Sequence, residues 1–394
     1  MSGGGAGEGP GYVLVTGDFV TTGGMDRANH ALALYLARLG RRVELVAHRV
    51  DAPLLACPTV VFHRVPKPLN SYWLAEPLLA RAGRRAAARA ASAGGRVVVN
   101  GGNCGWGDVN WIHYVHAAWT PRAGGGALRR VRRALYHRTA LAAERAAVRR
   151  ARVVVANSEQ TRSLIIERLG VPPERVHTVY YGTDPERFRP ATPDERAGAR
   201  ARLGWNDDRP TLAFVGALGD LRKGLDTLLA AWQLLAADPR WDARLAVVGT
   251  GSNLGLLKQQ AAHVGGSVEF LGFRSDVPEV LRGCDALVSP TRYEAYGLNV
   301  HEALCCGLPA LVSRAAGIAE RYPDELADLL IPDPDDPAGL ADQLRHWHAG
   351  REKYRAPVRR LADRLRSTTW DDMAGRIVAL VEGVPAGLED GPNW

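Results

Sequence analysis

The sequence contains no apolar run that approaches the roughly 20 residues a membrane-spanning helix requires. Its first eleven residues, MSGGGAGEGPG, have neither the basic segment nor the apolar segment of a secretory signal peptide. The five cysteines are an odd number without the spacing of a metal site, so disulfides are not implied. These absences predict a cytoplasmic protein in a reducing compartment.

No short tandem repeat is evident, and the composition is that of an ordinary globular chain, with 46% apolar and 23% charged residues. At 394 residues the chain is longer than one hydrophobic core usually supports, so two domains are expected. The formal net charge is +8. That charge favours phosphorylated or polyanionic partners, although it says nothing about the fold.

Short apolar runs alternate with longer helical patterns along the whole chain, which is typical of parallel α/β folds. In the first half, strands are expected at residues 13–16, 43–47, 60–62, 97–99, 112–115 and 153–156, and helices at 27–39, 74–91 and 127–150. In the second half, strands are expected at 211–215, 245–248, 268–271, 286–289 and 310–312, and helices at 224–235, 254–262, 299–306 and 337–347. Two rounds of this alternation predict two doubly wound parallel-sheet domains.

A segment rich in proline, glycine and charge separates the two rounds, between residues 181 and 210. We therefore expect a first domain over residues 12–190 and a second over residues 207–368. Residues 369–385 carry an amphipathic pattern and predict a C-terminal helix.

Ligands of open α/β sheets bind beyond the carboxyl ends of the strands, where helix N-termini point at them. The first such loop is TGDFVTTGGM, in which Gly23 and Gly24 allow backbone N–H groups to approach a phosphate. Glycine pairs also serve ordinary tight turns, and that interpretation stays open. The loop lacks the G-x-G-x-x-G spacing of a dinucleotide site, which argues against a nicotinamide cofactor.

The second loop, FVGALGDLRKGLDTLL, leaves a strand at Gly216 and places Arg222 and Lys223 at the start of the next helix. Two cations at a helix N-terminus oppose the helix dipole, which disfavours a plain solvated pair. An arginine fork and a lysine point charge suit a diphosphate. We expect this loop to contact phosphate.

The third loop, PTRYEAYGLNVHEALCCG, carries Glu294 after a strand and Glu302 eight positions later in the following helix. Ionised carboxylates are strong acceptors for sugar and ribose hydroxyls. Either glutamate alone is readily explained as a surface charge, but their joint placement favours a ligand site. The residues expected to open this helix with free N–H groups are Tyr296, Gly297, Leu298 and Asn299.

This third loop resembles the E-x7-E element of retaining glycosyltransferases with the GT-B fold, in particular glycosyltransferase family four. Other short segments agree with that family in the same order: GGM, VHAAW, ANS, YYGTDPERF, FVG…RKG, VVGTGS, FLGFRSDVP and AGIAE. The resemblance covers the chain from about Val13 to Glu382. It implies two Rossmann-like doubly wound domains that face each other across a cleft, the first on the acceptor side and the second binding the nucleotide sugar. It also implies that the C-terminal helix crosses back to the first domain.

The resemblance implies a role for each candidate residue of the second domain. Glu302 would accept hydrogen bonds from the donor ribose, and Glu294 would hold hydroxyls of the transferred sugar. Arg222 and Lys223 would neutralise the departing diphosphate and act with Glu294 in catalysis. The other donor-binding residues implied for this domain are Gly216, Gly249, Gly251, Arg274, Tyr296, Gly297, Leu298 and Asn299.

For the first domain, the resemblance implies that the Gly23 and Gly24 turn contacts the diphosphate and that His116 reaches the donor sugar near the scissile bond. From the residues alone, with His113 three positions earlier at the end of an apolar strand, a buried structural imidazole is the favoured explanation of His116. The sequence departs from the family at Ala217, where many members have an arginine. Either Arg222 takes over that phosphate contact, or leaving-group stabilisation is weaker.

Taken together, the resemblance implies a metal-independent, retaining hexosyltransferase that uses a UDP- or GDP-sugar and no further cofactor. The resemblance also implies front-face attack, and the sequence shows no evident double-displacement nucleophile, which fits that route without demonstrating it. The DPDD segment at residues 333–336 precedes a helix and suits capping better than metal binding. The alternatives are an epimerase-like enzyme and a non-catalytic sensor of sugar nucleotides, and the joint presence of His116, Glu294 and Lys223 favours catalysis.

The sequence leaves the acceptor open among a glycan, a lipid-linked compound and a small molecule, and no nucleic acid partner is expected. The segment from Arg129 to Arg152 combines many arginines with apolar residues. A solvated helix face is the favoured interpretation. Peripheral contact with the inner face of the membrane is the alternative.

Overall fold

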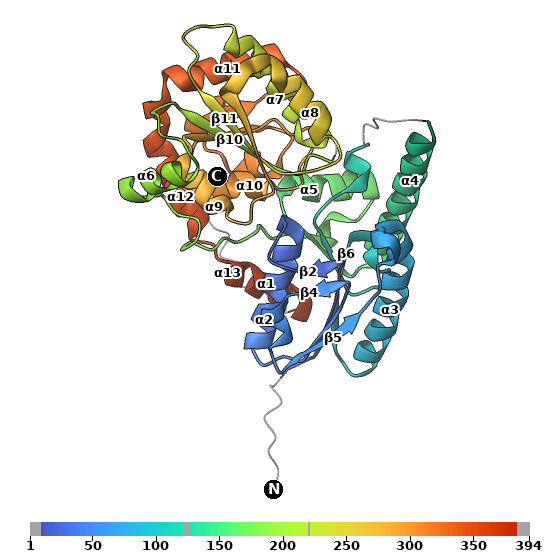
Figure 1. Cartoon of the computed structure of the whole chain (residues 1–394). Helices are drawn as coiled ribbons and strands as arrows, with labels where there is room; N and C mark the ends of the chain where they lie inside the picture. Colours follow the sequence, from blue (N-terminus) through green and yellow to red (C-terminus); the bar gives the residue numbers. More distant parts are fainter. Residues whose placement is uncertain (1–8, 121–126, 220, 384–394) are drawn as a thin grey trace. The chain divides into compact units, whose positions relative to one another are not determined.

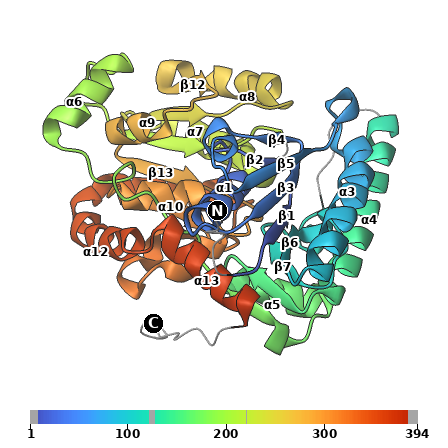
Figure 2. The same ribbon diagram turned by 90° about the horizontal axis from the view of Figure 1, so that it is seen from below.

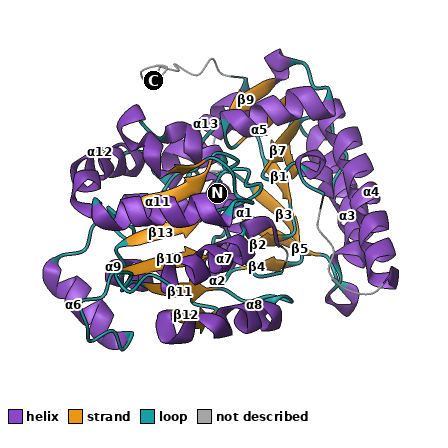
Figure 3. Ribbon diagram, turned by 90° about the horizontal axis from the view of Figure 1, so that it is seen from above, coloured by secondary structure: helices purple, strands orange, loops and turns teal. Residues whose placement is uncertain are grey.

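The computed structural model describes residues 9–120, 127–219 and 221–383, which form two compact units (Figure 1). The chain leaves the first unit after Gly182 and returns to it at Trp370. Each unit is built on one parallel sheet with helices on both sides, which confirms the predicted α/β class (Figure 3).

The sheet of the first unit has seven parallel strands in the order β5-β3-β1-β6-β7-β8-β9. Their bounds are β1 Tyr12–Val15, β3 Val43–Ala47, β5 Val60–Arg64, β6 Arg96–Asn100, β7 Val109–Ile112, β8 Val153–Ala156 and β9 Val176–Thr178. A separate parallel pair joins β2 (Asp18–Phe19) to β4 (Arg49–Val50). Runs such as YVLV in β1 and VVVA in β8 are wholly buried, as expected of parallel strands covered by helices on both faces.

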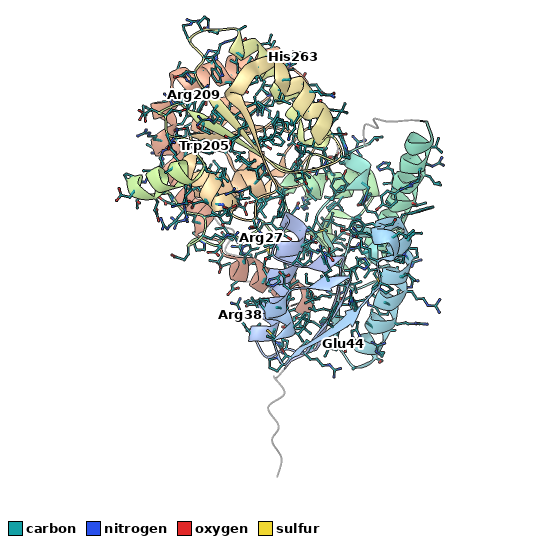
Figure 4. All side chains as sticks on the ribbon, in the orientation of Figure 1. Arg27, Arg38, Glu44, Trp205, Arg209 and His263 are labelled. Atoms are coloured by element: carbon teal, nitrogen blue, oxygen red, sulfur yellow. The ribbon has the colours of Figure 1, made fainter. Side chains whose placement is uncertain are left out.

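The helices of the first unit include the last one in the sequence. They are α1 Gly24–Arg38, α2 Ala52–Leu55, α3 Tyr72–Ser92, α4 Ala127–Arg150, α5 Glu159–Leu164 and α13 Trp370–Glu382. Helix α13 packs against α1 (Figure 2), where Arg38 forms an ion pair with Asp371 (Figure 4). At its other end the Tyr12 hydroxyl donates a 2.7 Å hydrogen bond to Glu382. The C-terminal helix therefore belongs to the first unit.

The sheet of the second unit has six parallel strands in the order β12-β11-β10-β13-β14-β15. The strands are β10 Thr211–Val215, β11 Arg244–Val248, β12 Val268–Gly272, β13 Ala286–Ser289, β14 Ala310–Ser313 and β15 Leu330–Ile331. The helices are α6 Pro193–Arg202, α7 Leu225–Ala236, α8 Leu254–Ala261, α9 Val277–Gly283, α10 Leu298–Cys305, α11 Pro337–Ala349 and α12 Arg355–Arg366.

The strand order of this second sheet changes direction between β10 and β13. Strands β11 and β12 continue on one side of β10, and β14 and β15 continue on the other side of β13. In doubly wound sheets the loops after the strands at such a switch point hold the ligand. Here those loops begin at Gly216 and Pro290. The fold therefore points to the same two loops as the sequence.

The expected linker between residues 181 and 210 contains a helix instead. Thr192 Oγ1 accepts a hydrogen bond from the Glu195 N–H, and the Glu195 carboxylate accepts one from the Thr192 N–H, which forms a capping box for α6. Helix α6 packs against α9, and the second unit comprises Thr183–Thr369, so residues 183–206 belong to it.

The strand expected at residues 112–115 was placed too late. It is β7, which ends at Ile112 and contains the fully buried Asn110. The Asn110 side chain donates a 3.0 Å hydrogen bond to the Gly101 carbonyl. A polar residue inside the strand hid the apolar pattern on which the prediction depended.

The Arg-rich segment forms α4, as expected. Its buried positions include Glu144 and Val148, whereas Val131 and Leu135 are 65% and 52% exposed. None of the described helices is both long and apolar enough to cross a bilayer. Peripheral contact through α4 stays a prediction.

Candidate active site

The first loop at the switch point of the second unit follows β10. After Gly216 the chain forms a short 3-10 turn, Leu221–Lys223, and enters α7 through Gly224. Gly224 has φ 72°, and a Cβ atom there would lie 1.8 Å from the Pro290 carbonyl oxygen. Only glycine permits this approach. The loop that carries the two cations therefore lies against the loop that follows β13.

Glu294 joins the two cations of this loop. Its Oε2 accepts a 3.1 Å hydrogen bond from Arg222 Nη1 and a further one from Lys223 Nζ. All three side chains are between 16% and 18% exposed. Burial alone would raise the pKa of the Glu294 carboxyl, but Lys223 and Arg222 more than offset it, so the pKa lies below its ordinary value. Glu294 is ionised at neutral pH, and the three charges sum to one positive charge.

Arg292 holds the cation loop in shape. Its guanidinium is 5% exposed and donates 2.8 Å hydrogen bonds to both carboxylate oxygens of Asp226. It also donates to the Leu221 carbonyl and, at 2.6 Å, to Asp335. Its backbone N–H donates to the Arg222 carbonyl at 2.8 Å. Sequence reasoning missed this residue, because its partners lie in three separate segments.

The second loop at the switch point leads into α10. Gly297 precedes the helix, and Asn299 in its first turn donates a 2.9 Å hydrogen bond from Nδ2 to the Val215 carbonyl. This bond attaches the start of α10 to the end of β10. Glu302 follows within α10 and is 6% exposed. The structure thus brings Arg222, Lys223, Glu294 and Asn299 onto two adjoining loops.

Two of the expected helix-opening residues have buried side chains. Tyr296 is 1% exposed, and its hydroxyl lies 2.7 Å from His301 Nδ1. Leu298 is 8% exposed. Both side chains pack in the interior, so only their backbone groups are available to a ligand.

Gly216, Gly249 and Gly251 lie together at the carboxyl ends of β10 and β11. A Cβ atom on Gly249 would lie 1.9 Å from the Gly216 carbonyl oxygen, and one on Gly251 would lie 2.2 Å from a backbone carbon of the β10 loop. Close approach of the two loops accounts for these glycines. Arg274, 33% exposed, forms a 2.6 Å ion pair with Asp276. Donor contact by these residues stays a prediction.

His116 of the first unit begins a short 3-10 turn, His116–Ala118, after β7. The fully buried Glu144 of α4 accepts a 3.0 Å hydrogen bond from the His116 N–H and lies 2.9 Å from its Nδ1. The carboxylate keeps the proton on Nδ1, which leaves Nε2 for another partner. The imidazole is 31% exposed. Glu144 was missed, because one acid within an Arg-rich helix gives no local signal.

The description of a buried structural imidazole fits His113 and not His116. The His113 Nδ1 lies 2.5 Å from the Tyr181 hydroxyl, and Nε2 lies 3.3 Å from Asn29 Nδ2. Burial lowers the pKa of His113 to about 3, so this ring is neutral. The two histidines of the VHAAW region therefore differ in role.

The glycine turn of the first unit opens α1. Gly23 has φ 90° and caps the helix, and Gly24 is its first residue. In the first helical turn, burial and the neighbouring Asp18 raise the pKa of Asp26 to about 7. The turn therefore presents a helix N-terminus beside an acid whose charge is disfavoured. Diphosphate contact at Gly24 stays a prediction.

The capping role expected for the DPDD segment is confirmed. Asp336 accepts 3.0 Å hydrogen bonds from the Ala338 and Gly339 N–H groups at the start of α11. Within the described ranges, no three His, Cys, Asp or Glu side chains are grouped so that they could hold a metal ion. The absence of a metal requirement stays a prediction.

Comparison with known proteins agrees with this architecture. A family model described as glycosyltransferase family 4 matches residues 22–187, and one described as glycosyl transferases group 1 matches residues 209–349. A D-inositol 3-phosphate glycosyltransferase of Geodermatophilus obscurus is 34% identical over 239 residues, which cover 57% of this chain and 51% of that protein. A GDP-mannose-dependent monoacylated alpha-(1-6)-phosphatidylinositol monomannoside mannosyltransferase of Corynebacterium glutamicum is 31% identical over 226 residues, covering 52% and 55%.

The chain thus spans about half the length of the curated relatives it matches. A sucrose-phosphate synthase structure from Thermosynechococcus elongatus superposes with a TM-score of 0.75 at 22% identity, covering 95% of this chain and 98% of that one. Two Rossmann-like units of this kind define the GT-B fold. The chain belongs to glycosyltransferase family 4.

Proposed function

We propose that the protein is a retaining, metal-independent glycosyltransferase that moves a hexose-type sugar from a UDP- or GDP-sugar to a hydroxyl acceptor. The main support is the cluster of Arg222, Lys223 and Glu294 on the two loops of the switch point. Family membership and the names of the relatives support the same reaction class. The name of the mannosyltransferase relative supports GDP-mannose as one donor to test.

The proposed chemistry begins with the leaving group. Rupture of the anomeric bond places new negative charge on the departing diphosphate. Preorganised cations aimed at that charge are usually the largest catalytic contribution. Arg222 and Lys223 supply two such cations, and their contact with Glu294 holds them in place without a metal. Their net positive charge is available to the diphosphate.

The sugar and the ribose require acceptors for their hydroxyl hydrogens. Glu294 is proposed to hold hydroxyls of the transferred sugar, and Glu302 those of the ribose. Both are largely buried, so their hydrogen bonds to a ligand would be little weakened by water. His116 is proposed to contact the donor sugar through Nε2, since Glu144 occupies Nδ1.

The test measures donor binding and donor turnover. Thermal unfolding of the wild type is followed with UDP-glucose, GDP-mannose and ADP-glucose, and a donor at about 100 times its dissociation constant adds roughly 2.7 kcal/mol of stability. Release of the nucleoside diphosphate is then followed with and without D-inositol 3-phosphate. NMR of the product reports whether the anomeric configuration is retained.

Lys223→Ala should fold as the wild type does and lose turnover by at least about 100-fold. The matched control is Lys353→Ala, which removes one lysine from an exposed ion pair with Asp328. Wild-type turnover in Lys223→Ala would overturn the proposal. Donor binding without any transfer would support a sensor instead.

A further inference from the structure

A cavity of about 760 Å³ lies in the second unit at the amino ends of β13 and β14. Asp285, just before β13, and Pro309, just before β14, form part of its wall. The candidate active site follows the carboxyl ends of the same sheet. Pro290 lies five positions after Asp285, a distance that in a strand spans roughly 17 Å. The cavity is therefore separate from the donor-binding loops.

The cavity has an apolar floor and a basic rim. Leu281, Leu308 and Trp347 contribute apolar surface. Five arginines from three segments line the cavity: Arg196 of α6, Arg282 of α9, and Arg351, Arg355 and Arg359 in and just before α12. The contacts of α6 with α9, and of α12 with α10, bring these segments together (Figure 1).

The spacing of two of these arginines carries a cost. Arg355 and Arg359 are four residues apart in α12, so they project from successive turns of one face, and Arg351 precedes them in the 3-10 turn Arg351–Tyr354. Like charges at this spacing destabilise a helix. A bound anion would remove this cost, whereas an apolar partner would not.

The ion pairs leave this rim with excess positive charge. Arg196 pairs with Asp285 at 2.8 Å, Arg282 pairs with Glu279 at 3.2 Å, and Arg355 pairs with Glu352 at 2.9 Å. Three carboxylates are thus paired with three of the five arginines. Arg351 and Arg359 form no ion pair with any described residue.

A further observation sets Arg351 and Arg359 apart. The adjacent Arg360 is paired with Glu325 at 2.8 Å, so an unpaired arginine is not the rule along this helix.

We propose that this cavity binds a small molecule carrying a phosphate or diphosphate group. Arginine forks match phosphate oxygens in pairs, and the apolar floor suits the organic part of such a molecule. The volume lies in the usual range of small-molecule sites, about 300–1,000 Å³. The site is independent of the proposed transfer reaction and adds a second phosphate-binding position to the chain.

The test uses inorganic pyrophosphate as the probe and isothermal titration calorimetry of the full chain at about 0.15 M salt, where weak surface attraction is screened. All variants are made in a Lys223→Ala background, which weakens the donor site. Arg351→Gln with Arg359→Gln is compared with Arg360→Gln, which removes a paired arginine of the same helix. The side chains of Arg351 and Arg359, which the double variant replaces, are not buried.

The Lys223→Ala protein is expected to bind pyrophosphate. Adding Arg351→Gln and Arg359→Gln together should weaken that binding at least about tenfold. Arg360→Gln should leave it unchanged. Lack of binding in the Lys223→Ala protein, or equal binding in all three proteins, would overturn the proposal. Loss of binding in Arg360→Gln as well would also overturn it, since general charge and not the cavity would then be responsible. Failure here leaves donor binding by the wild type unaffected, so the two proposals are tested separately.

Discussion

Glu144 accepts hydrogen bonds from both the backbone N–H and the ring of His116, at 3.0 and 2.9 Å. Glu144 has no exposed surface, so it contacts His116 and not a substrate. A carboxylate behind a histidine fixes the protonated nitrogen and the orientation of the ring. Glu144 is therefore a positioning residue, and its effect on the reaction is separable from its effect on stability.

We expect Glu144→Gln to lower kcat by roughly 10- to 100-fold while the donor dissociation constant changes by less than about threefold. The glutamine amide offers one acceptor oxygen in place of two, so the ring loses its fixed orientation. Glu76→Gln is the control. Glu76 accepts a 2.6 Å hydrogen bond from Tyr136 and so joins α3 to α4, which makes it a second carboxylate that contacts α4. Equal losses in the two variants would show that helix packing, and not His116, matters.

Arg292→Ala should destabilise the second unit by about 3 kcal/mol, because it leaves the Asp226 carboxylate without its bidentate partner. It should also weaken donor binding, since the cation loop loses its contact with the Leu221 carbonyl. Urea denaturation and calorimetry measure the two effects. The control Arg345→Ala, which breaks an exposed pair with Asp342, should cost less than about 0.5 kcal/mol. A similar cost for both would refute the loop-fixing role.

Asp26 should make the first unit less stable as the pH rises. Its pKa in the folded state is about 7, whereas the ordinary pKa of an aspartate, 3.8, applies in the unfolded state, so between these values the folded state binds more protons than the unfolded one. Stability therefore falls as the pH increases from about 4 to 7. Asp26→Asn should raise the Tm at pH 8 and leave it nearly unchanged at pH 4. A constant difference between the proteins at both pH values would contradict this explanation.

Much of the sheet architecture could be predicted because buried parallel strands are continuous apolar runs. Strands β3, β8, β10 and β13 have the predicted bounds, and β7 was displaced because the buried Asn110 interrupts its run. Helix α12 was missed, although Val358, Leu361, Ala362 and Leu365 form a buried stripe at helical spacing, because arginines dominate its composition. Helix α6 was taken for a linker, although its capping box was a readable signal.

The candidate site was predictable in part for a similar reason. The loops that follow predicted strands can be located from the sequence, and two of these loops contain Arg222, Lys223 and Glu294. That these side chains meet in one ion-paired cluster depends on how β10 and β13 are paired. The supporting residues Arg292 and Glu144 bind partners distant in sequence, so no local pattern identifies them.

Gly224→Ala provides a test of how closely the two active-site loops must approach. A methyl group there would lie 1.8 Å from the Pro290 carbonyl oxygen, which is backbone and can move only with the loop. Gly204→Ala is the matched control, because Gly204 has a similar φ of 77° but no atom within 4 Å of the added carbon. Both variants pay the conformational cost of about 1–2 kcal/mol for a non-glycine residue at positive φ.

Only Gly224→Ala should also separate the loops, so we expect it to lose donor-induced thermal stabilisation as well as intrinsic stability. The control should lose intrinsic stability alone and keep its full response to a nucleotide sugar. Thermal unfolding with and without the donor measures both quantities in one experiment. If the two variants respond equally to the donor, contact between the loops is not needed for donor binding, and the cation loop acts by itself.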